Sequence, residues 1–376
     1  MTIVRLSKSS VGSDEQAALA RVVAAGYLGM GEEVRLFEAE VAVFLGGGLE
    51  VVAVATGTAA LHLAVAGLDI GPGDEVLVPT LTYVASFQAI AATGAIPVAC
   101  DVRDDTLAID MADAARRVGP RTRAIMPVHY ASHPGERAAI FAFAAARGLR
   151  VIEDAAHSFG GRDVTGARIG ADGDIVCFSF DGIKNITCGE GGALVTRDPA
   201  LAQRARDARL LGVEKDTEKR YSGQRSWDFD VVRQGFRYHM SNLMAAVGRV
   251  QLTKLEGFAE RRRALVERYR AAFAGSNAVR ILPLDYDRMV PHIFVVRVAP
   301  DRRDGLMAHL RAQDIECGLH YKPNHLLTLF ADGEARPVAE TVYAEMLSLP
   351  LHAELGDAEQ ERVIAAIIAF CETAAS

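Results

Sequence analysis

The chain has 376 residues, of which half are hydrophobic and 24% are charged, and its formal net charge is −7. This length exceeds one small core and predicts two domains, while the composition is typical of an ordinary globular protein. The negative charge argues against partners such as nucleic acid or an acidic membrane surface. No uncharged apolar run approaches the roughly 20 residues of a membrane-spanning helix, and Met1–Lys8 lacks the apolar core of a signal peptide.

Between about Val51 and Thr196, short apolar runs alternate with segments of helical period. This alternation is typical of an α/β fold with a mostly parallel sheet and helices on both faces. We expect the last two strands, joined by the turn that contains Lys184, to be the antiparallel exception. The predicted strands are Val51–Ala55, Glu75–Pro79, Ile96–Cys100, Ala124–Val128, Val151–Asp154, Ile175–Ser179 and Ala193–Thr196, with helices such as Ala59–Ala66 and Glu136–Ala146 between them.

The second half of the chain begins with a polar stretch, Glu214–Gln234, which a compact domain rarely carries unless it is functional or mobile. A long amphipathic helix follows over Ser241–Ala274, with Ser241 as its N-cap. We expect this helix to link a large domain (residues 1–240) to a smaller α+β domain (residues 241–376). The smaller domain is predicted to contain strands near Val279–Leu282 and Ile293–Val298 and helices at Arg303–Gln313 and Asp357–Thr373.

The segment around Thr56-Gly57-Thr58 joins a predicted strand to a predicted helix. Backbone N–H groups and a hydroxyl at a helix N-terminus form an anion site, so this turn is a candidate phosphate cradle. The alternative is that Thr58 is only a helix N-cap. Tyr83 follows another strand end and could stack on a flat ring, although an aromatic residue at such a position usually belongs to the core.

Asp154 ends a short buried strand, and in open α/β sheets ligands bind beyond the carboxyl ends of strands. A carboxylate at that point can hold a pyridinium nitrogen protonated, which turns the ring into an electron sink. His157, three residues later, could stack on such a ring or form a hydrogen bond beside it. An Asp at a strand end is equally often a helix N-cap, and this alternative stays open.

Lys184 lies five residues after Ser179, where an apolar run gives way to a glycine-rich turn with few charges nearby. Desolvation disfavours the ammonium form of such a lysine, and the neutral amine is the nucleophile that condenses with a carbonyl. The alternative is an ordinary lysine at a hairpin tip. Together these features describe the site of a planar, phosphorylated pyridine aldehyde, pyridoxal phosphate. In that site Lys184 would hold the aldehyde, Asp154 the ring nitrogen, Tyr83 a ring face, and Gly57, Thr58 and Ser179 the phosphate.

The chain resembles the DegT/DnrJ/EryC1/StrS family of sugar aminotransferases nearly end to end. The matching blocks follow in the family's order at Gly26–Gly31 with Val34 and Phe37-Glu38, at Thr56–Ala60, Pro79–Ala85, Pro127–His129, Glu153–His157 and Ser179–Gly192, and at Gly318–Pro323 and Leu347–His352. The resemblance implies fold type I of the pyridoxal phosphate enzymes. It also implies a ping-pong transfer of an amino group from glutamate or glutamine to a nucleotide-linked 3-keto or 4-keto hexose, in amino-sugar synthesis for cell-surface polysaccharides or secondary metabolites.

Three alternatives accompany this interpretation. A dehydratase of the same fold replaces the lysine with histidine, which Lys184 argues against. An aminotransferase acting on a cyclitol or an aromatic precursor would keep the same residues. A non-catalytic regulator that only retains the cofactor is the third, although the chain carries no appended basic arm.

Substrate contacts are less well marked. His320 and Tyr321 fall in a family block, and the polar stretch offers Arg220, Arg225 and Trp227 for a sugar or diphosphate. Leu28, in the opening block, is a further candidate. The competing interpretation is a structural histidine and a solvated loop.

The family usually has Gly, any residue, Asn, any residue, Arg and Met where this chain has Gly235–Met240. In relatives the Asn reaches the cofactor phosphate of the other subunit, so the resemblance implies an obligate homodimer with shared active sites. Arg237 occupies the Asn position, and its forked, permanently charged side chain suits a phosphate; alternatively it points to solvent. His239 stands where Arg is usual, which leaves its role open.

The five cysteines are scattered, odd in number and free of metal-ligand spacing. We therefore predict reduced thiols in a cytosolic protein and no metal site. Cys188 lies near Lys184 in the sequence, but we expect it to have a structural role and not a catalytic one. The cysteines are Cys100, Cys177, Cys188, Cys317 and Cys371.

Overall fold

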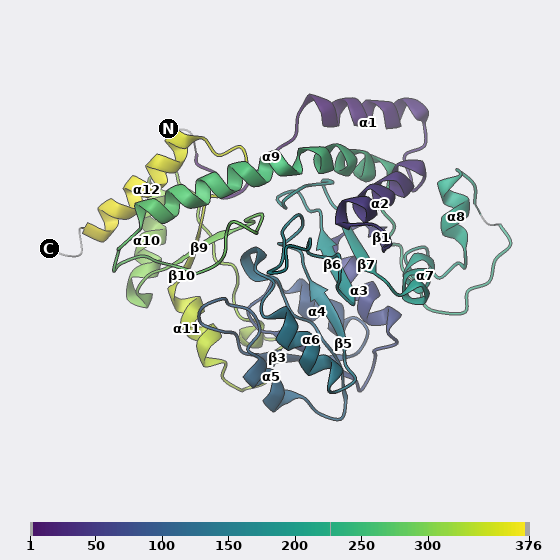
Figure 1. Cartoon of the computed structure of the whole chain (residues 1–376), viewed down its shortest axis with the longest axis horizontal. Coiled ribbons are helices and arrows are strands. Elements are labelled where there is room, and N and C mark those ends of the chain that lie inside the picture. Colours follow the sequence, from purple (N-terminus) through teal and green to yellow (C-terminus); the bar gives the residue numbers. More distant parts are fainter. Residues whose placement is uncertain (1–2, 226, 373–376) are drawn as a thin grey trace.

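The computed structural model describes residues 3–225 and 227–372, and within them a seven-stranded sheet forms the centre of the molecule (Figure 1). The strand β7 is antiparallel to both of its neighbours and the other pairings are parallel, which confirms the expected exception. In spatial order the strands are β1 (Glu50–Val54), β7 (Gly192–Thr196), β6 (Ile175–Ser179), β5 (Arg150–Asp154), β4 (Thr122–Ile125), β2 (Glu75–Pro79) and β3 (Ile96–Cys100).

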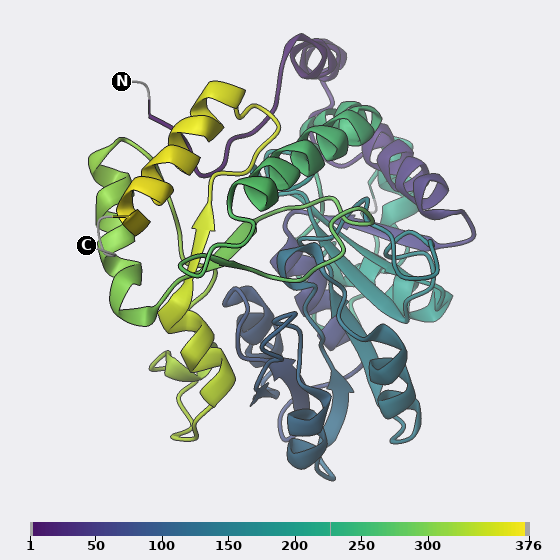
Figure 2. The same cartoon turned by 60° about the vertical axis from the view of Figure 1, so that its left-hand side comes forward.

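Helices cover both faces of this sheet, as the alternation of elements predicted (Figure 2). On β1, Val52 and Val54 pack in one core cluster with α3, α4 and α7, whereas Val51 and Ala53 pack on the opposite face with α2 and α9. This division follows from the alternation of side chains along a strand. The helices of this part are α1 (Ser13–Ala25), α2 (Glu32–Leu45), α3 (Gly57–Gly67), α4 (Ala85–Ala91), α5 (Met111–Arg117), α6 (Arg137–Ala145), α7 (Pro199–Ala208) and α8 (Asp216–Tyr221).

The C-terminal part is a smaller antiparallel sheet with helices, in the order β10 (Met346–Leu349), β9 (Phe294–Arg297) and β8 (Arg280–Ile281). Its helices are α10 (Pro300–Ala312), α11 (Pro337–Glu345) and α12 (Asp357–Glu372). The sequence analysis predicted neither α11 nor β10. The predicted end of the last helix, Thr373, lies outside the described residues.

The long helix α9 (Asn242–Ala272) begins where predicted, because the Ser241 hydroxyl accepts a hydrogen bond from the N–H of Met244. It runs along both parts of the molecule (Figure 1). The first residues of the chain also contact the C-terminal part: Val4 forms a bridge with Ile315. The division of the chain at residue 240 therefore stays a prediction, and the N-terminal segment belongs spatially to both parts.

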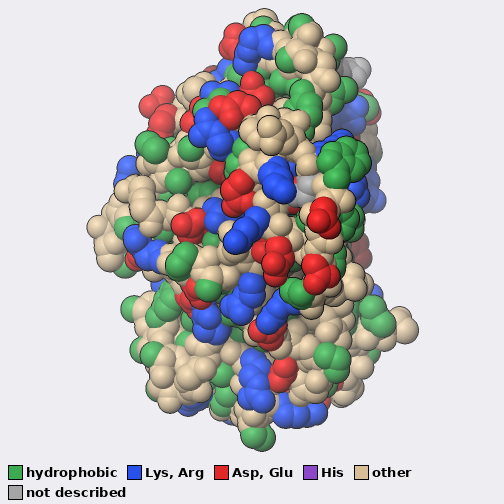
Figure 3. All heavy atoms as spheres, turned by 90° about the vertical axis from the view of Figure 1, so that its right-hand side faces the viewer, with side chains coloured by type: hydrophobic (Ala, Val, Ile, Leu, Met, Phe, Trp, Pro, Cys, Tyr) green, Lys and Arg blue, Asp and Glu red, His purple; other side chains and the backbone are tan. Residues whose placement is uncertain are grey.

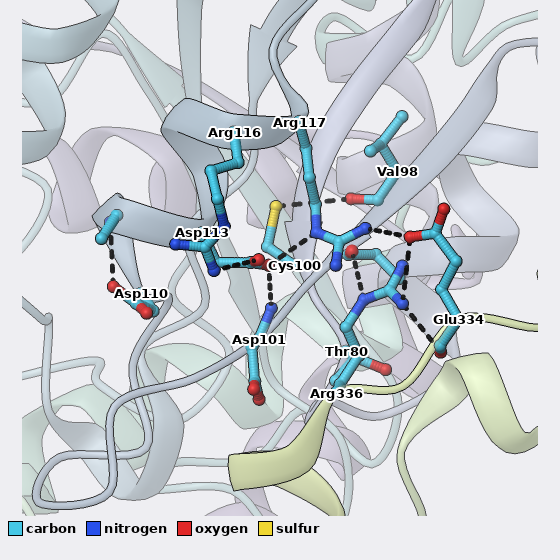
Figure 4. A network of polar contacts seen from close by, with 12 residues as sticks. Thr80, Val98, Cys100, Asp101, Asp110, Asp113, Arg116, Arg117, Glu334 and Arg336 are labelled. Carbon is cyan, nitrogen blue, oxygen red and sulfur yellow. Dashed lines mark hydrogen bonds and ion pairs between the residues drawn. The ribbon is translucent and has the colours of Figure 1, made fainter.

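A polar network connects the C-terminal part to the edge of the large sheet (Figure 4). Arg117 of α5 donates to Asp113 at 2.6 Å and to Glu334 at 2.7 Å. Asp113 also accepts a hydrogen bond from the backbone N–H of Asp101. The buried side chain of Arg336 donates to the carbonyl of Ala99 at 2.8 Å. These contacts fix the two parts against each other.

The polar stretch Glu214–Gln234 is not structureless, since it contains α8, although one of its residues, Ser226, lies outside the described part. The hydroxyl of Tyr221 contacts Glu38, and Glu38 pairs with the buried Arg209. Beyond the helix the stretch is exposed, and Trp227 is 86% accessible. Figure 3 views this side of the molecule and shows positive and negative side chains interspersed on it.

Candidate active site

A cavity of about 410 Å³ opens at the carboxyl ends of the parallel strands. Nine of the predicted site residues line it: Gly57, Thr58, Tyr83, Asp154, His157, Ser179, Lys184, His320 and Tyr321. They come from segments that are far apart in the sequence, and the sheet brings them together because parallel strands end at one edge.

The helix α3 begins at this cavity, and its N-cap is Thr56, whose hydroxyl accepts from the N–H of Ala59 at 3.0 Å. The alternative assignment of the cap to Thr58 is therefore wrong, and the Thr58 side chain is free to face the cavity. Gly57 is required by close packing, since a Cβ there would lie 2.7 Å from the Cβ of Ser179. The helix N-terminus and the Ser179 hydroxyl thus converge as an anion cradle.

Asp154 is buried and ends β5 beside the cavity. It accepts hydrogen bonds from the Ser86 hydroxyl at 2.7 Å and from the N–H of Ala156 at 3.2 Å. No helix begins there in the described structure, so the N-cap alternative is wrong. Burial raises the pKa of the Asp154 carboxyl despite these two donors and the nearby Lys184. A cation bound in the cavity would provide the positive charge that balances the Asp154 carboxylate.

Lys184 reaches the same cavity from the turn after β6. The residue is half-buried, and its Nζ lies 3.4 Å from Nε2 of His292. Burial lowers the pKa of the Lys184 amine to about 8, against the opposing negative charges of Asp154 and Asp181. The prediction of a desolvated lysine is consistent with this environment, and such an amine is partly neutral near physiological pH.

Aromatic and imidazole rings also line the cavity. His157 is buried, its Nε2 lies 3.0 Å from the Tyr321 hydroxyl, and its Nδ1 has no hydrogen-bond partner among the described residues. Tyr83 is 59% exposed and its ring lies 5.5 Å from that of Tyr321. The alternative that Tyr83 belongs to the core is therefore wrong. Nδ1 of His320 lies 2.8 Å from the Ser348 hydroxyl, and the two form a hydrogen bond.

The sequence analysis missed Ser86, which fixes Asp154, and His292, which contacts Lys184. Ser86 directly follows the block Pro79–Ala85 that resembles the family, but its hydroxyl gave no signal of a partner 68 positions away. His292 is a lone histidine in an apolar run, a pattern that equally indicates a core residue. Asp181 and Glu190 also line the cavity without having been predicted.

Five predicted residues do not line this cavity: Leu28, Arg220, Arg225, Trp227 and Arg237. Leu28 is 45% exposed and its carbonyl accepts from the N–H of Asn242. Arg237 is exposed on the surface. The structure does not bring these residues to the site, and their contacts with cofactor or substrate stay predictions.

His239 and Cys188 both lie away from the chemistry. His239 is half-buried and forms a bridge with Val54, and burial together with the charge of Arg237 lowers its pKa to about 4. Cys188 is buried in the core, where burial raises the pKa of its thiol far above the ordinary value. An uncharged buried thiol is a poor nucleophile, in keeping with a structural role.

The described residues contain no group of three or more His, Cys, Asp or Glu side chains that could hold a metal ion. Among the same residues, none of the helices combines the length and the apolar character that crossing a bilayer requires.

The model of the DegT/DnrJ/EryC1/StrS aminotransferase family matches residues 9–368. The chain belongs to this family. It is 38% identical over 368 residues to dTDP-4-dehydro-2,3,6-trideoxy-D-glucose 4-aminotransferase of Saccharopolyspora spinosa, covering 96% of this chain and 95% of the relative.

Solved structures agree with this assignment. The aminotransferase TlmJ from Streptoalloteichus hindustanus superposes with a TM-score of 0.91 at 33% identity, over 100% of both chains. The S. venezuelae protein DesV, solved in complex with a ketimine intermediate, superposes with a TM-score of 0.86 at 38% identity, over 95% of this chain and 94% of DesV. The predicted fold type I and the predicted aminotransferase activity are thereby confirmed.

The enzyme uses pyridoxal phosphate, and the cavity fits this cofactor on three observations. A helix N-terminus and a hydroxyl meet at one end, where a phosphate is favoured. A buried carboxylate with a raised pKa, Asp154, lies where a protonated ring nitrogen would neutralise it. An amine of lowered pKa, Lys184, and an unpartnered nitrogen of buried His157 face the same space.

Proposed function

We propose that this enzyme transfers an amino group from glutamate or glutamine to the keto carbon of a nucleotide-linked hexose. The observation that carries the proposal is the convergence of Lys184, Asp154 and the α3 N-terminus on one cavity, in a chain of this family. The relative from S. spinosa is named for a dTDP-linked 4-keto sugar. A 4-keto deoxyhexose is therefore the first substrate to test, and the product would be an amino-sugar for polysaccharide or secondary-metabolite synthesis.

The roles of the chain's residues follow from their chemistry. The bound cofactor supplies an aldehyde and an electron-withdrawing ring. The neutral Lys184 amine would hold the aldehyde and, once displaced by the amino donor, act as the general base that moves the proton from the donor's α-carbon. Asp154 would keep the ring nitrogen protonated through its charge. His157 and Tyr83 would flank the ring, while Gly57, Thr58 and Ser179 would hold the phosphate.

Substrate contacts form a second part of the proposal. His320 and Tyr321 line the cavity, and they would contact a sugar hydroxyl near the reacting carbon. Arg225 and Trp227 would contact the diphosphate or sugar of the neighbouring subunit, since both lie away from the cavity of their own chain. Leu28 is assigned to the same group.

We further propose a homodimer with two shared sites. Arg237 is exposed and has no place in its own cavity, which supports a role for it at the partner's phosphate. A guanidinium can form two parallel hydrogen bonds to phosphate oxygens. All five cysteines are free, which fits the reducing cytosol in which we propose the enzyme works.

The shared site is tested by mixing subunits. An Arg237→Ala protein should bind pyridoxal phosphate more weakly and stay dimeric. When it is mixed with a Lys184→Ala protein, one site of each mixed dimer has both wild-type residues, and activity should return. Verified mixed dimers without recovered activity, or a fully active monomer, would contradict the shared site.

The substrate is tested with a panel of keto-sugar nucleotides that differ in keto position and nucleotide, each incubated with glutamate and analysed by mass. The Lys184→Ala protein serves as the blank. We expect amination of a 4-keto sugar. Turnover of a cyclitol ketone alone would favour the cyclitol alternative. An absorption spectrum of the bound cofactor that does not respond to glutamate or glutamine would favour a regulator.

A further inference from the structure

Three imidazoles surround the Lys184 amine: those of His157, His292 and His320. His292 is the closest to it, with Nε2 3.4 Å from Nζ, and its ring centroid lies 4.4 Å from that of His157. Only 4% of His292 is exposed. None of the roles assigned above involves His292, although it contacts the residue on which the chemistry depends.

The backbone around His292 is fixed from two sides. The N–H of His292 donates to the Ser132 hydroxyl at 3.0 Å. The side-chain amide of Asn185, the neighbour of Lys184, donates to the carbonyl of Val290 at 3.1 Å. The turn that carries the lysine and the loop that carries the histidine are therefore joined directly, so the 3.4 Å contact is set by the fold and not by two free side chains.

A buried cation lies behind this loop. Arg262 of α9 donates to the carbonyls of Pro291 at 3.2 Å, His292 at 3.3 Å and Leu351 at 3.1 Å, and the structure pairs it with no carboxylate among the described residues. Burial is the main reason that the pKa of His292 lies well below the ordinary value, and the nearby Lys184, His157 and Arg262 add to this effect. His292 is therefore neutral at physiological pH and carries one ring proton.

The position of that proton follows from the partners of the ring. Nδ1 of His292 is buried without a hydrogen-bond partner among the described residues. An N–H left without an acceptor in the interior is the rarer and costlier arrangement, since buried donors are almost always paired. The proton therefore belongs on Nε2, which faces Lys184 and can donate only to an amine with a free lone pair.

We propose that His292 is a positioning residue that donates its Nε2–H to the lone pair of the neutral Lys184 amine, which favours the uncharged form and directs it into the cavity. The proposal rests on the proposed role of Lys184. His157 and His320 also face the amine as neutral imidazoles, and Asp154 and Asp181 oppose the effect because their charges favour an ammonium. Hydrogen bonding to the neutral form of a base lowers the pKa of that base.

The test uses His292→Phe in the full-length protein freed of cofactor. Phenylalanine fills the site and excludes water but has no N–H, so the pKa of the Lys184 amine should rise by about one unit. The pKa is read from the pH dependence of acylation at Lys184, followed by mass spectrometry. His292→Gln keeps a donor and should stay near the wild-type value. His352→Phe, at a buried histidine that has no contact with Lys184, is the matched control.

His292→Met, a second variant without a donor, should give the same rise and keeps the test valid if the Phe protein does not fold. An unchanged lysine pKa in the folded donor-less variants would overturn the proposal, as would a rise in the Gln variant as large as in Phe. These readings need neither cofactor nor substrate. The outcome of this test is therefore independent of the proposed function, which an active Lys184→Ala protein would contradict separately.

Discussion

Two consecutive carboxylates on β5, Glu153 and Asp154, lie in opposite electrostatic environments although both are buried. Glu153 contacts Arg137 at 2.8 Å and His129 at 3.0 Å, and although burial opposes ionisation, these donors lower its pKa to about 2. Asp154 has only a hydroxyl and a backbone N–H as donors, and its pKa is raised. One face of the strand therefore completes its charge balance within the protein, whereas the cavity face leaves a negative charge for a ligand to balance.

The largest expected effect is on the cavity face. Lys184→Ala removes the amine, and turnover should fall by roughly 10⁴-fold or more, because nucleophile and general base are lost together. Lys219→Ala, at an exposed lysine of α8, is the control and should keep full turnover. Steady-state kinetics with circular dichroism separates lost chemistry from lost folding. A Lys184→Ala enzyme with near wild-type turnover would remove the basis of the proposed site.

Asp154→Asn tests the unbalanced carboxylate. The amide oxygen can still accept from the N–H of Ala156, and the amide NH2 can donate to the Ser86 hydroxyl in place of the second oxygen, but the negative charge that would hold a ring nitrogen protonated is gone. Turnover should fall by roughly 10³-fold, while the free energy of unfolding of the cofactor-free protein changes little. An Asn variant that retains most of its turnover would show that the charge is not used.

Glu153→Gln is the corresponding substitution at the carboxylate that is paired within the protein. It leaves Arg137 and His129 without their acceptor charge, so the free energy of unfolding should fall by about 3 kcal/mol, while the folded fraction keeps its turnover. Because the pKa of Glu153 is lowered by folding, its contribution is fully present above about pH 4.5 and is lost as pH falls toward 2. Urea unfolding at several pH values measures this; a variant as stable as wild type at pH 7 would contradict it.

A pH series sharpens the comparison further. With a Lys184 pKa of about 8, the neutral amine is the minor form at pH 7 and the major form above pH 8. Capture of pyridoxal phosphate by the cofactor-free protein should therefore accelerate about tenfold between pH 7 and 9, and level off above the pKa. Stopped-flow absorbance measures the rate. A rate that falls with rising pH would exclude a neutral Lys184 as the reacting group.

The smallest effect is expected outside the cavity. Arg225→Ala removes one exposed charge from the polar stretch, and the KM for the sugar nucleotide should rise a few-fold with little change in kcat. The half-reaction with glutamate is an internal control and should be unaffected. A change confined to the glutamate half-reaction would show that Arg225 does not contact the sugar substrate.

Local patterns in the sequence were sufficient to predict most of the large sheet. Apolar runs bounded by turn residues gave β2, β3 and β6 with their observed ends, and β4 ended earlier than expected. By contrast, β10 follows α11 without an intervening turn residue, so no local signal separates Glu345 from Met346. The short α8 has no apolar period, and its Tyr221 contacts Glu38 from a distant part of the chain.

For the site, residues that carry chemistry at strand ends were predictable, since residue type and position both contribute to the signal. Lys184, Asp154 and His157 are examples. Residues whose role depends on a contact between distant loops were not. His292 and Lys184 are 108 positions apart, and only the folded chain brings them together. The sequence also does not decide which threonine is the N-cap of α3, because Thr56 and Thr58 are both suitable residues for that position.

The N-terminal segment has a consequence for how the protein is made. Arg5 pairs with Glu316, 311 positions later, and Leu6 accepts from the N–H of Leu351. A ribosome synthesises this segment first, so Arg5 and Leu6 stay without these two partners until nearly all of the chain has been synthesised. The hydroxyl of Ser9, in the same segment, donates to the carbonyl of Gly182, two residues before Lys184. The segment that braces the lysine turn is therefore fully anchored only after synthesis of the C-terminal part.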